Sequence, residues 1–224
     1  MTFRHLIRKI KSRLRNKFGH DGGIKCRNFP QPENFEDWIS SNRLAPPCPA
    51  VAKHLVLERP HIPGAVWLET GTHLGHTTRF LSGFSPRVIS IEPSEFYFQE
   101  ACKALSGLAN VDLVQGTSES SLALLLRELH GKDLCLWLDG HYSGGKTYQG
   151  KNQTPIELEL KIISQNLSCL SSVAVLIDDF RLCWLQPGTY PRPSDYVRWA
   201  ESNGLNWTIE QDIFVAKSPN LPLY

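Results

Sequence analysis

The chain has 224 residues, of which 41% are hydrophobic and 21% are charged, and its formal net charge at pH 7 is +2. A chain of this length accommodates one sizeable domain with a covering segment and is too short for two comfortable domains. No apolar run reaches the roughly 18 residues that a bilayer span requires, which argues against an integral membrane protein.

The positive charge is concentrated at the start of the sequence. Seven Lys or Arg residues and no acidic residue lie within residues 1–17, whereas the remainder has 17 basic and 22 acidic residues. Apolar residues at a three-to-four residue spacing predict an amphipathic helix over residues 1–18. This helix could contact an anionic membrane surface or a partner, act as an organelle transit peptide, or pack on the domain with its charges in water.

Residues 21–64 are rich in Pro and Gly, with predicted helices at Glu33–Ser41 and Ala50–Glu58. We interpret residues 1–64 as a basic helix and a helical cap that precede a main domain over residues 65–224. The six cysteines form no C-x-x-C pair, which favours reduced thiols in a cytoplasmic protein.

From residue 65 onward, short apolar runs alternate with helical periods, which is typical of a parallel sheet with crossover helices. The predicted strands are Ala65–Glu69, Val88–Glu92, Val111–Val114, Leu134–Leu138 and Val173–Ile177. The predicted helices are Gly75–Ser82, Glu95–Ser106, Glu119–His130, one that starts at Thr154, and Asp195–Ser202. Trp207–Lys217 reads as a closing antiparallel hairpin that turns at Gln211 and Asp212. The prediction is a doubly wound, mostly parallel α/β sheet.

A glycine-containing loop follows the first predicted strand. Ligands of open α/β sheets bind at the carboxyl ends of the strands where the strand order reverses, here after the first and fourth strands. Glycines there let the backbone approach a ligand at the start of the next helix. The loop residues that we expect in a cofactor pocket are Glu69, Gly71, Thr72, His73 and Gly75.

Glu69 bears on which cofactor this pocket takes. A carboxylate beside a dinucleotide pyrophosphate would be repelled, whereas S-adenosylmethionine (SAM) presents an ammonium and a sulfonium. The loop also lacks the G-x-G-x-x-G order of dinucleotide sites. Glu69 therefore favours SAM over NAD.

Later strand ends supply the remaining expected cofactor contacts. Glu92, with Pro93 after it, ends the second strand 23 residues beyond Glu69, where a carboxylate can accept both ribose hydroxyls. Ser118 and Glu119 follow the third strand, where either could accept from an adenine amino group. The alternative for Ser118 is a helix N-cap.

These segments together resemble the successive motifs of class I SAM-dependent methyltransferases over about residues 65–217. The matching segments are Glu69-x-Gly-x-x-x-Gly75, Ile91-Glu-Pro93, Gly116-Thr-Ser118, Leu138-Asp-Gly-His141 and Ile177-Asp-Asp179. The resemblance implies a Rossmann-like methyltransferase fold and Asp139 as a further cofactor-binding and catalytic residue.

Three carboxylates end the fourth and fifth predicted strands, which a doubly wound order places about 4.8 Å apart. Converging acids repel one another unless a cation intervenes, and oxygen ligands suit Mg²⁺, Mn²⁺ or Ca²⁺. The set resembles the metal site of catechol-type and macrocin-type sugar O-methyltransferases, which implies Asp139, Asp178 and Asp179 as ligands. Alternatively, Asp179 caps the following turn or pairs with Arg181.

His141 lies two residues beyond Asp139, where an imidazole could take the acceptor's proton, bind a metal or face solvent. The run from Gly140 to Thr147 also matches the letters of a phosphate-binding loop. The next helix is expected too late for such a loop, because Thr147 should lie in its first turn. A flexible substrate loop fits better.

The sequence therefore predicts a methyltransferase that uses SAM and a divalent cation, Mg²⁺ foremost, to methylate a hydroxyl of a small or sugar-like acceptor. Trp184, Tyr190, Arg192 and Tyr196 could form a rim for that acceptor. No nucleic-acid partner is expected, and a homo-oligomer remains open. The alternatives are a nicotinamide-dependent oxidoreductase or NTPase on the same sheet, and a non-catalytic module docked through the basic helix.

Overall fold

The computed structural model describes residues 36, 38–39, 46–140, 147–148, 150 and 154–221. These residues belong to one unit that spans residues 32–224. The predicted basic helix over residues 1–18 and His141 lie outside the described residues, as does most of the predicted helix Glu33–Ser41. Within the described part, no helix has the length and apolar character that crossing a bilayer requires.

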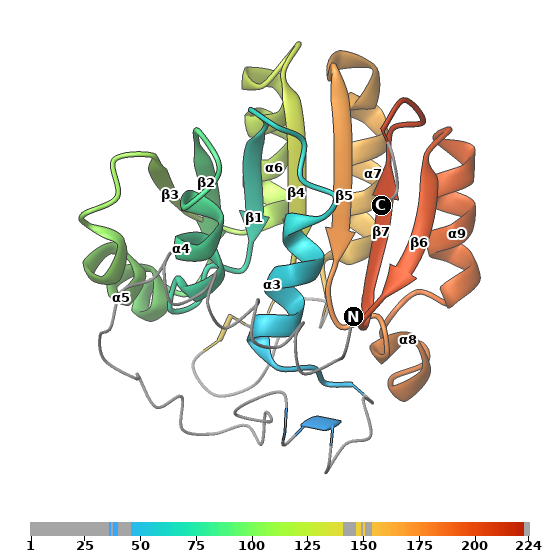
Figure 1. Ribbon diagram of the computed structural model, residues 1–224, viewed down its shortest axis with the longest axis horizontal. Coiled ribbons are helices and arrows are strands. Elements are labelled where there is room, and N and C mark those ends of the chain that lie inside the picture. Colours follow the sequence, from blue (N-terminus) through green and yellow to red (C-terminus); the bar gives the residue numbers. More distant parts are fainter. Residues whose placement is uncertain are drawn as a thin grey trace, which may run out of the picture. The chain divides into compact units, whose positions relative to one another are not determined.

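The described strands form one seven-stranded mixed sheet in the order β3-β2-β1-β4-β5-β7-β6 (Figure 1). The strands are β1 (Val66–Thr70), β2 (Val88–Glu92), β3 (Val111–Gln115), β4 (Asp133–Leu138), β5 (Ser172–Ile177), β6 (Asn206–Glu210) and β7 (Ile213–Lys217). β1 to β5 are parallel, whereas β7 is antiparallel to both β5 and β6. The strand order reverses between β1 and β4, which confirms the predicted doubly wound sheet.

Helices connect the strands and cover the sheet. They are α3 (Ala50–Glu58), α4 (His76–Ser82), α5 (Glu95–Leu105), α6 (Ser118–Glu128), α7 (Ile156–Asn166), α8 (Leu182–Leu185) and α9 (Pro193–Ser202). A one-turn 3₁₀ helix, Leu167–Cys169, follows α7. Sequence patterns did not predict α8 or this 3₁₀ turn, because an element of three or four residues is too short to show a helical period.

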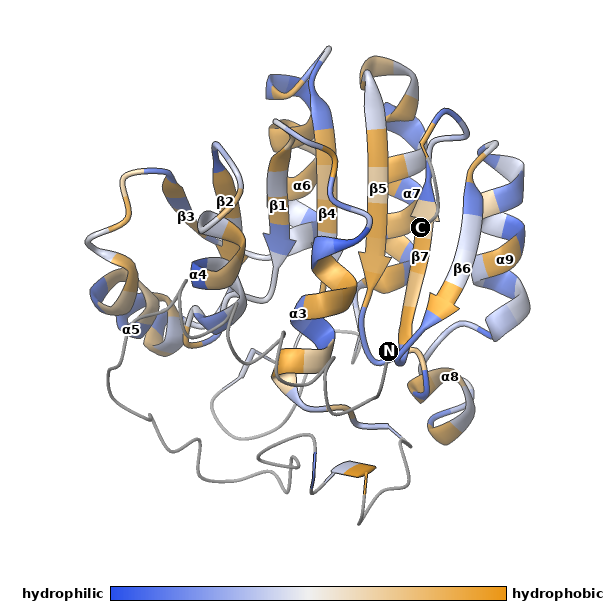
Figure 2. Cartoon of the chain, viewed as in Figure 1, coloured by the Kyte–Doolittle hydropathy of each residue, from blue (hydrophilic) through white to orange (hydrophobic). Residues whose placement is uncertain are grey.

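The central strands β4 and β5 are almost continuously apolar and buried because both faces of the sheet are covered there. In β4, Leu136 packs in a cluster that includes residues of α6, α7 and α9, whereas its neighbour Trp137 packs in a second cluster with residues of α3 and α4. Figure 2 shows the resulting apolar colouring along β4, β5 and β7. Side chains that alternate along a strand therefore enter two separate cores.

The closing hairpin is the predicted one. Gln211 and Asp212 have φ angles of 48° and 73°, a combination that matches the twist of tight hairpin turns. The backbone amide of Phe180 donates to the carbonyl of Asp212 at 2.8 Å, which ties this turn to the end of β5.

Strand register brings the ends of β1, β4 and β5 to one level. Thr70 pairs with Leu138, and Leu138 pairs with Ile177. The next amides continue this pattern, because Asp139 N donates to Thr70 O and Asp178 N donates to Leu138 O, both at 3.1 Å. The loops predicted to hold the site therefore meet at this carboxyl edge.

Candidate functional site

The loop after β1 passes unusually close to the loop after β4. Gly71 has a φ of +89°, and a Cβ atom there would lie 2.5 Å from the carbonyl oxygen of Asp139. Gly75, the N-cap of α4, has a φ of +77°, and its Cβ atom would lie 2.8 Å from Leu105. Both glycines adopt a left-handed backbone conformation, and the absent Cβ of Gly71 makes room for the Asp139 carbonyl, whereas their predicted role of admitting a ligand stays a prediction.

Glu92, at the end of β2, holds the loop after β1 and the start of the loop after β2 through hydrogen bonds to two backbone amides. Its Oε2 accepts from the backbone amide of His73 at 2.7 Å, and its Oε1 accepts from the amide of Ser94 at 2.8 Å. Burial raises the pKa of Glu92, and the two amide donors oppose that effect. Each carboxylate oxygen accepts one bond here and has a second lone pair for a ligand hydroxyl.

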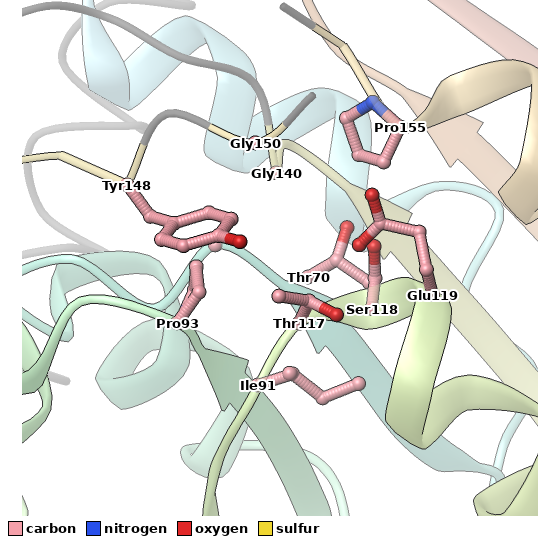
Figure 3. Close-up of a pocket in the computed structure, with 11 residues that line it drawn as sticks. Thr70, Ile91, Pro93, Thr117, Ser118, Glu119, Gly140, Tyr148, Gly150 and Pro155 are labelled. Atoms are coloured by element: carbon pink, nitrogen blue, oxygen red, sulfur yellow. The ribbon is translucent and has the colours of Figure 1, made fainter. Parts of the chain in front are cut away.

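A pocket opens above these loops at the carboxyl edge of the sheet (Figure 3). Tyr148 and Pro93 lie on one side of it, and Ser118 and Glu119 lie on the other. The residues that line it are Thr70, Gly71, Ile91, Pro93, Thr117, Ser118, Glu119, Gly140, Tyr148, Gly150 and Pro155. The structure thus brings predicted residues of three strand ends into one pocket.

Several lining residues escaped the sequence analysis. Thr70 and Ile91 adjoin predicted residues, so their positions at strand ends were the available signal. Tyr148, Gly150 and Pro155 come from the loop before α7, which has no periodicity that places it over the pocket. Thr117 is the N-cap of α6, accepting from Ser120 N at 3.3 Å, so the capping alternative considered for Ser118 belongs to Thr117.

Glu69 is buried and is absent from the lining of the pocket. Its Oε2 accepts from Thr78 at 2.5 Å and from Ser90 at 2.6 Å. Thr72 lies 2.6 Å from Ser90, and since the Ser90 hydrogen points to Glu69, Thr72 is the donor in that contact. Burial raises the pKa of Glu69 to about 7, against the lowering effect of the Ser90 and Thr78 hydroxyls. Glu69 thus anchors the loop, and direct contact with a cofactor stays a prediction.

The carboxylates predicted at the ends of β4 and β5, Asp139, Asp178 and Asp179, are called the acidic rim below. A positively charged lysine side chain of the protein already lies against them. The ammonium of Lys53, on α3, donates to Asp178 Oδ2 and lies 3.4 Å from Asp179 Oδ1. Asp178 Oδ1 accepts from the amide of Asp179 at 2.8 Å. The guanidinium of Arg181 pairs with Asp179 at 2.7 Å and also with Asp212, which confirms the alternative of an Asp179–Arg181 pair.

This arrangement does not fit a divalent cation at Asp139, Asp178 and Asp179. The Lys53 ammonium bonds Asp178 Oδ2 and lies 3.4 Å from Asp179 Oδ1, so a divalent cation between these carboxylates would meet a positive charge already in contact with both. Among the described residues, no three His, Cys, Asp or Glu side chains are arranged to hold a metal ion. The structure thus gives no support to the predicted metal site, because a lysine supplies the counter-charge that the sequence analysis assigned to a metal.

A second, smaller pocket adjoins the first, since Gly140 and Pro155 line both. Polar side chains in its wall are Thr154, Glu159, Asp178, Tyr190 and Tyr196. Of the predicted aromatic rim, Tyr190 and Tyr196 are thus in place, whereas Trp184 is 60% exposed and stacks edge-on against Phe180. Arg192 is exposed and bonds Asp195 at the start of α9.

The phosphate-loop alternative depends on a helix that contains Thr147. α7 begins only at Ile156, and Thr147 is not helical. A phosphate-binding loop leads directly into a helix that holds its Thr in the first turn, and Thr147 lacks that position. Residues 141–146 are outside the described part of the chain.

Comparison with known proteins identifies the fold. No family model matches this chain, and no curated protein matches it. Similar solved structures include the precorrin-6y C5,15-methyltransferase of Geobacter metallireducens, 13% identical, with a TM-score of 0.50, covering 77% of this chain and 89% of that one. An rRNA methylase of Streptococcus thermophilus is 18% identical, with a TM-score of 0.46 and coverage of 75% and 94%. The 23S rRNA methyltransferase ErmE is 14% identical, with a TM-score of 0.49 and coverage of 76% and 68%. The chain has the Rossmann-like methyltransferase fold.

The comparisons correct one expectation about partners. The sequence analysis expected no nucleic-acid partner, but structures named as rRNA methyltransferases are among those with this fold. The exclusion of nucleic acid is therefore wrong, because the names of these similar structures specify RNA. At this level of identity the likeness concerns the fold and does not assign an acceptor.

Proposed function

We propose that this chain binds SAM in the pocket over Gly71 and transfers its methyl group to a hydroxyl held in the adjoining pocket. The observation that carries the proposal is the shared wall: Gly140 and Pro155 line both pockets at the edge where the strand order reverses. Adjoining pockets can hold a cofactor and an acceptor side by side, which is what a direct transfer requires.

The residues of the first pocket suit this cofactor. Gly71 lines this pocket, and Glu92, which lies outside the lining, bonds the loop after β1 and has lone pairs left for ribose hydroxyls. The hydroxyl of Thr70 is buried at the pocket with no hydrogen-bond partner among the described residues, which leaves it for a ligand. When bound, SAM supplies an electrophilic methyl group.

The residues of the second pocket suit a hydroxyl acceptor. Burial, together with the negative charges of Asp179 and Asp139, raises the pKa of Tyr190, so its phenol stays protonated and can donate. Asp178 offers a carboxylate to a hydroxyl that donates. A pocket wall with both donors and acceptors can hold a hydroxyl in a fixed orientation.

Calorimetry tests the cofactor. Titration of the protein with SAM, S-adenosylhomocysteine, NAD and ATP in separate experiments should give binding for the first two alone. Binding of NAD or ATP with no binding of SAM would overturn the proposal in favour of another Rossmann-like activity.

Methyl transfer itself is tested with methyl-labelled SAM and a cell extract separated into RNA, protein and small molecules. Label should enter one fraction and resist mild base that cleaves carboxyl methyl esters. Incorporation that mild base removes would contradict a hydroxyl acceptor, and the fraction that carries label identifies the acceptor's class.

A further inference from the structure

The end of β5 concentrates charge in a small volume. Four carboxyl groups lie there, those of Asp139, Asp178, Asp179 and Asp212, and two basic side chains face them, Lys53 and Arg181. The side chain of Asp178 is 1% exposed and that of Lys53 is 17% exposed. A carboxylate this deeply buried needs a counter-charge within contact distance.

Lys53 supplies that counter-charge to Asp178. It donates to Asp178 Oδ2, and it also lies 3.4 Å from Asp179. Arg181 cannot take its place, because the guanidinium is held between Asp179 and Asp212. Burial alone would lower the pKa of Lys53, but attraction to Asp178, Asp179 and Asp139 outweighs it and raises the pKa, so the amine is charged.

The helix that carries Lys53 is firmly packed. Val56 and Leu57 of α3 are buried in the same cluster as Trp67 and Phe80. His54, beside Lys53 in sequence, stacks on Phe80 with ring centroids 4.0 Å apart. Lys53 therefore contacts the acidic rim from a helix whose position is fixed by core packing.

We propose that the Lys53 ammonium is the resident cation of this rim and replaces the divalent metal, so that the site works without any metal ion. The claim that catalysis needs no metal ion rests on the proposed function, whereas the claim that Lys53 occupies the acidic rim does not. Lys53 acts as a positioning residue: through its bond to Oδ2 it holds the Asp178 carboxyl in place at the second pocket, which Asp178 helps to line.

Manganese binding tests the occupancy directly, without SAM or an acceptor. The loss of the electron paramagnetic resonance signal of free Mn²⁺ is measured on wild type, Lys53→Met, and Lys53→Met combined with Asp178→Asn. Wild type should leave the signal unchanged at protein and Mn²⁺ concentrations of about 0.1 mM. A carboxylate site with a dissociation constant well below roughly 0.1 mM would remove most of the free Mn²⁺ signal under these conditions. Lys53→Met should bind Mn²⁺, and the double variant should lose most of that binding.

The matched control is Lys103→Met. Lys103 is 72% exposed and pairs with Glu100 on the surface, so its loss removes the same charge without opening a buried carboxylate. This variant should behave as wild type. If Lys53→Met fails to fold, Lys53→Gln keeps a polar side chain at the rim and is measured in its place.

Two results would overturn the proposal. One is Mn²⁺ binding by wild type that Asp178→Asn abolishes, since the rim would then be a metal site from which Lys53 is displaced. The other is a folded Lys53 variant that binds no Mn²⁺, since Lys53 would then not occupy a cation position. Both results can be interpreted even if the protein does not bind SAM, because the Mn²⁺ measurement uses no SAM. If methyl transfer is found, treatment with EDTA should change its rate less than twofold.

Discussion

Glu69 is a buried carboxyl group whose role differs from the one that its sequence position suggests. It holds the start of α4 and the middle of β2 together through Thr78 and Ser90. Its other oxygen, Oε1, is buried with no hydrogen-bond partner among the described residues. An ionised carboxylate with one unsatisfied oxygen is costly to bury, which is why the pKa of Glu69 rises to about 7.

This raised pKa predicts how stability depends on pH. The native state holds the Glu69 proton more tightly than the unfolded state, in which the pKa is about 4.5. The contribution to stability is therefore fully present below pH 4.5 and is lost as the pH rises to about 7. Glu69→Gln mimics the protonated form, so its stability relative to wild type should increase by up to roughly 3 kcal/mol between pH 5 and pH 8.

Urea unfolding of both proteins at the two pH values, without SAM, measures this effect. The quantity that matters is the change with pH in the difference between the two free energies of unfolding. An equal difference at both pH values would mean that Glu69 is already ionised at pH 5.

Gly71 offers a second prediction at the scale of one residue. In Gly71→Ala the new Cβ atom would lie 2.5 Å from the Asp139 carbonyl oxygen and would push the two loops of the pocket apart. SAM affinity should fall at least tenfold, about 1.4 kcal/mol. Calorimetry with SAM gives the dissociation constant.

Gly64→Ala is the matched control for Gly71→Ala. Its φ of +81° is nearly that of Gly71, but nothing lies within 4 Å of the position that its Cβ atom would take, and it precedes β1 at the opposite edge of the sheet. The control should carry the backbone strain alone, on the order of 1 kcal/mol of stability, and keep its SAM affinity. Similar losses of affinity in both variants would show that strain, and not the contact with Asp139, matters.

At the scale of elements, the β6–β7 turn is fastened to the end of β5. Asp212 accepts from the amide of Arg181 at 2.6 Å and pairs with its guanidinium. Asp212→Ala should lower the free energy of unfolding by about 2 kcal/mol, because the partly buried amide of Arg181 loses its acceptor and alanine is strained at a φ of 73°.

The comparison for that variant is Asp112→Ala. Asp112 pairs with Arg87 on the surface, where it is 53% exposed. Exposed pairs contribute about 0 to 1 kcal/mol. Chemical denaturation should thus separate the two variants clearly, and equal losses would mean that the Asp212 contacts add nothing beyond an exposed ion pair.

Sequence periodicity predicted which helices and strands exist, and it predicted their first and last residues less accurately. β2 has the predicted bounds, and α3 has the predicted bounds, because clear apolar periods end at recognisable breakers. Ser94 caps α5 as its sequence position suggests, accepting from Tyr97 N. The four-residue α8 had no such signal, and its position follows from the packing of Phe180 and Cys183 in the core.

At the scale of the whole molecule, the sequence located the pocket but not its complete wall. Gly71, Pro93, Ser118 and Glu119 line it because strand ends in a doubly wound sheet converge by topology alone. Tyr148 lines it through a long loop, and no local pattern encodes where such a loop lies.

The acidic rim was harder to interpret from sequence. The convergence of Asp139 and Asp178 follows from strand order, but their counter-charge comes from Lys53, in a helix far earlier in the chain. A pattern of acids without a visible base suggests a metal ion, and only the packing of α3 reveals the lysine.

The most direct test of the SAM pocket is amide hydrogen exchange with and without SAM. Bound SAM should slow exchange in peptides that cover the loops after β1, β2 and β3, including the amides of His73 and Ser94 that Glu92 holds. Peptides of the β6–β7 hairpin should be unchanged. Protection confined to the hairpin, or no protection at saturating SAM, would contradict a SAM site at this edge of the sheet.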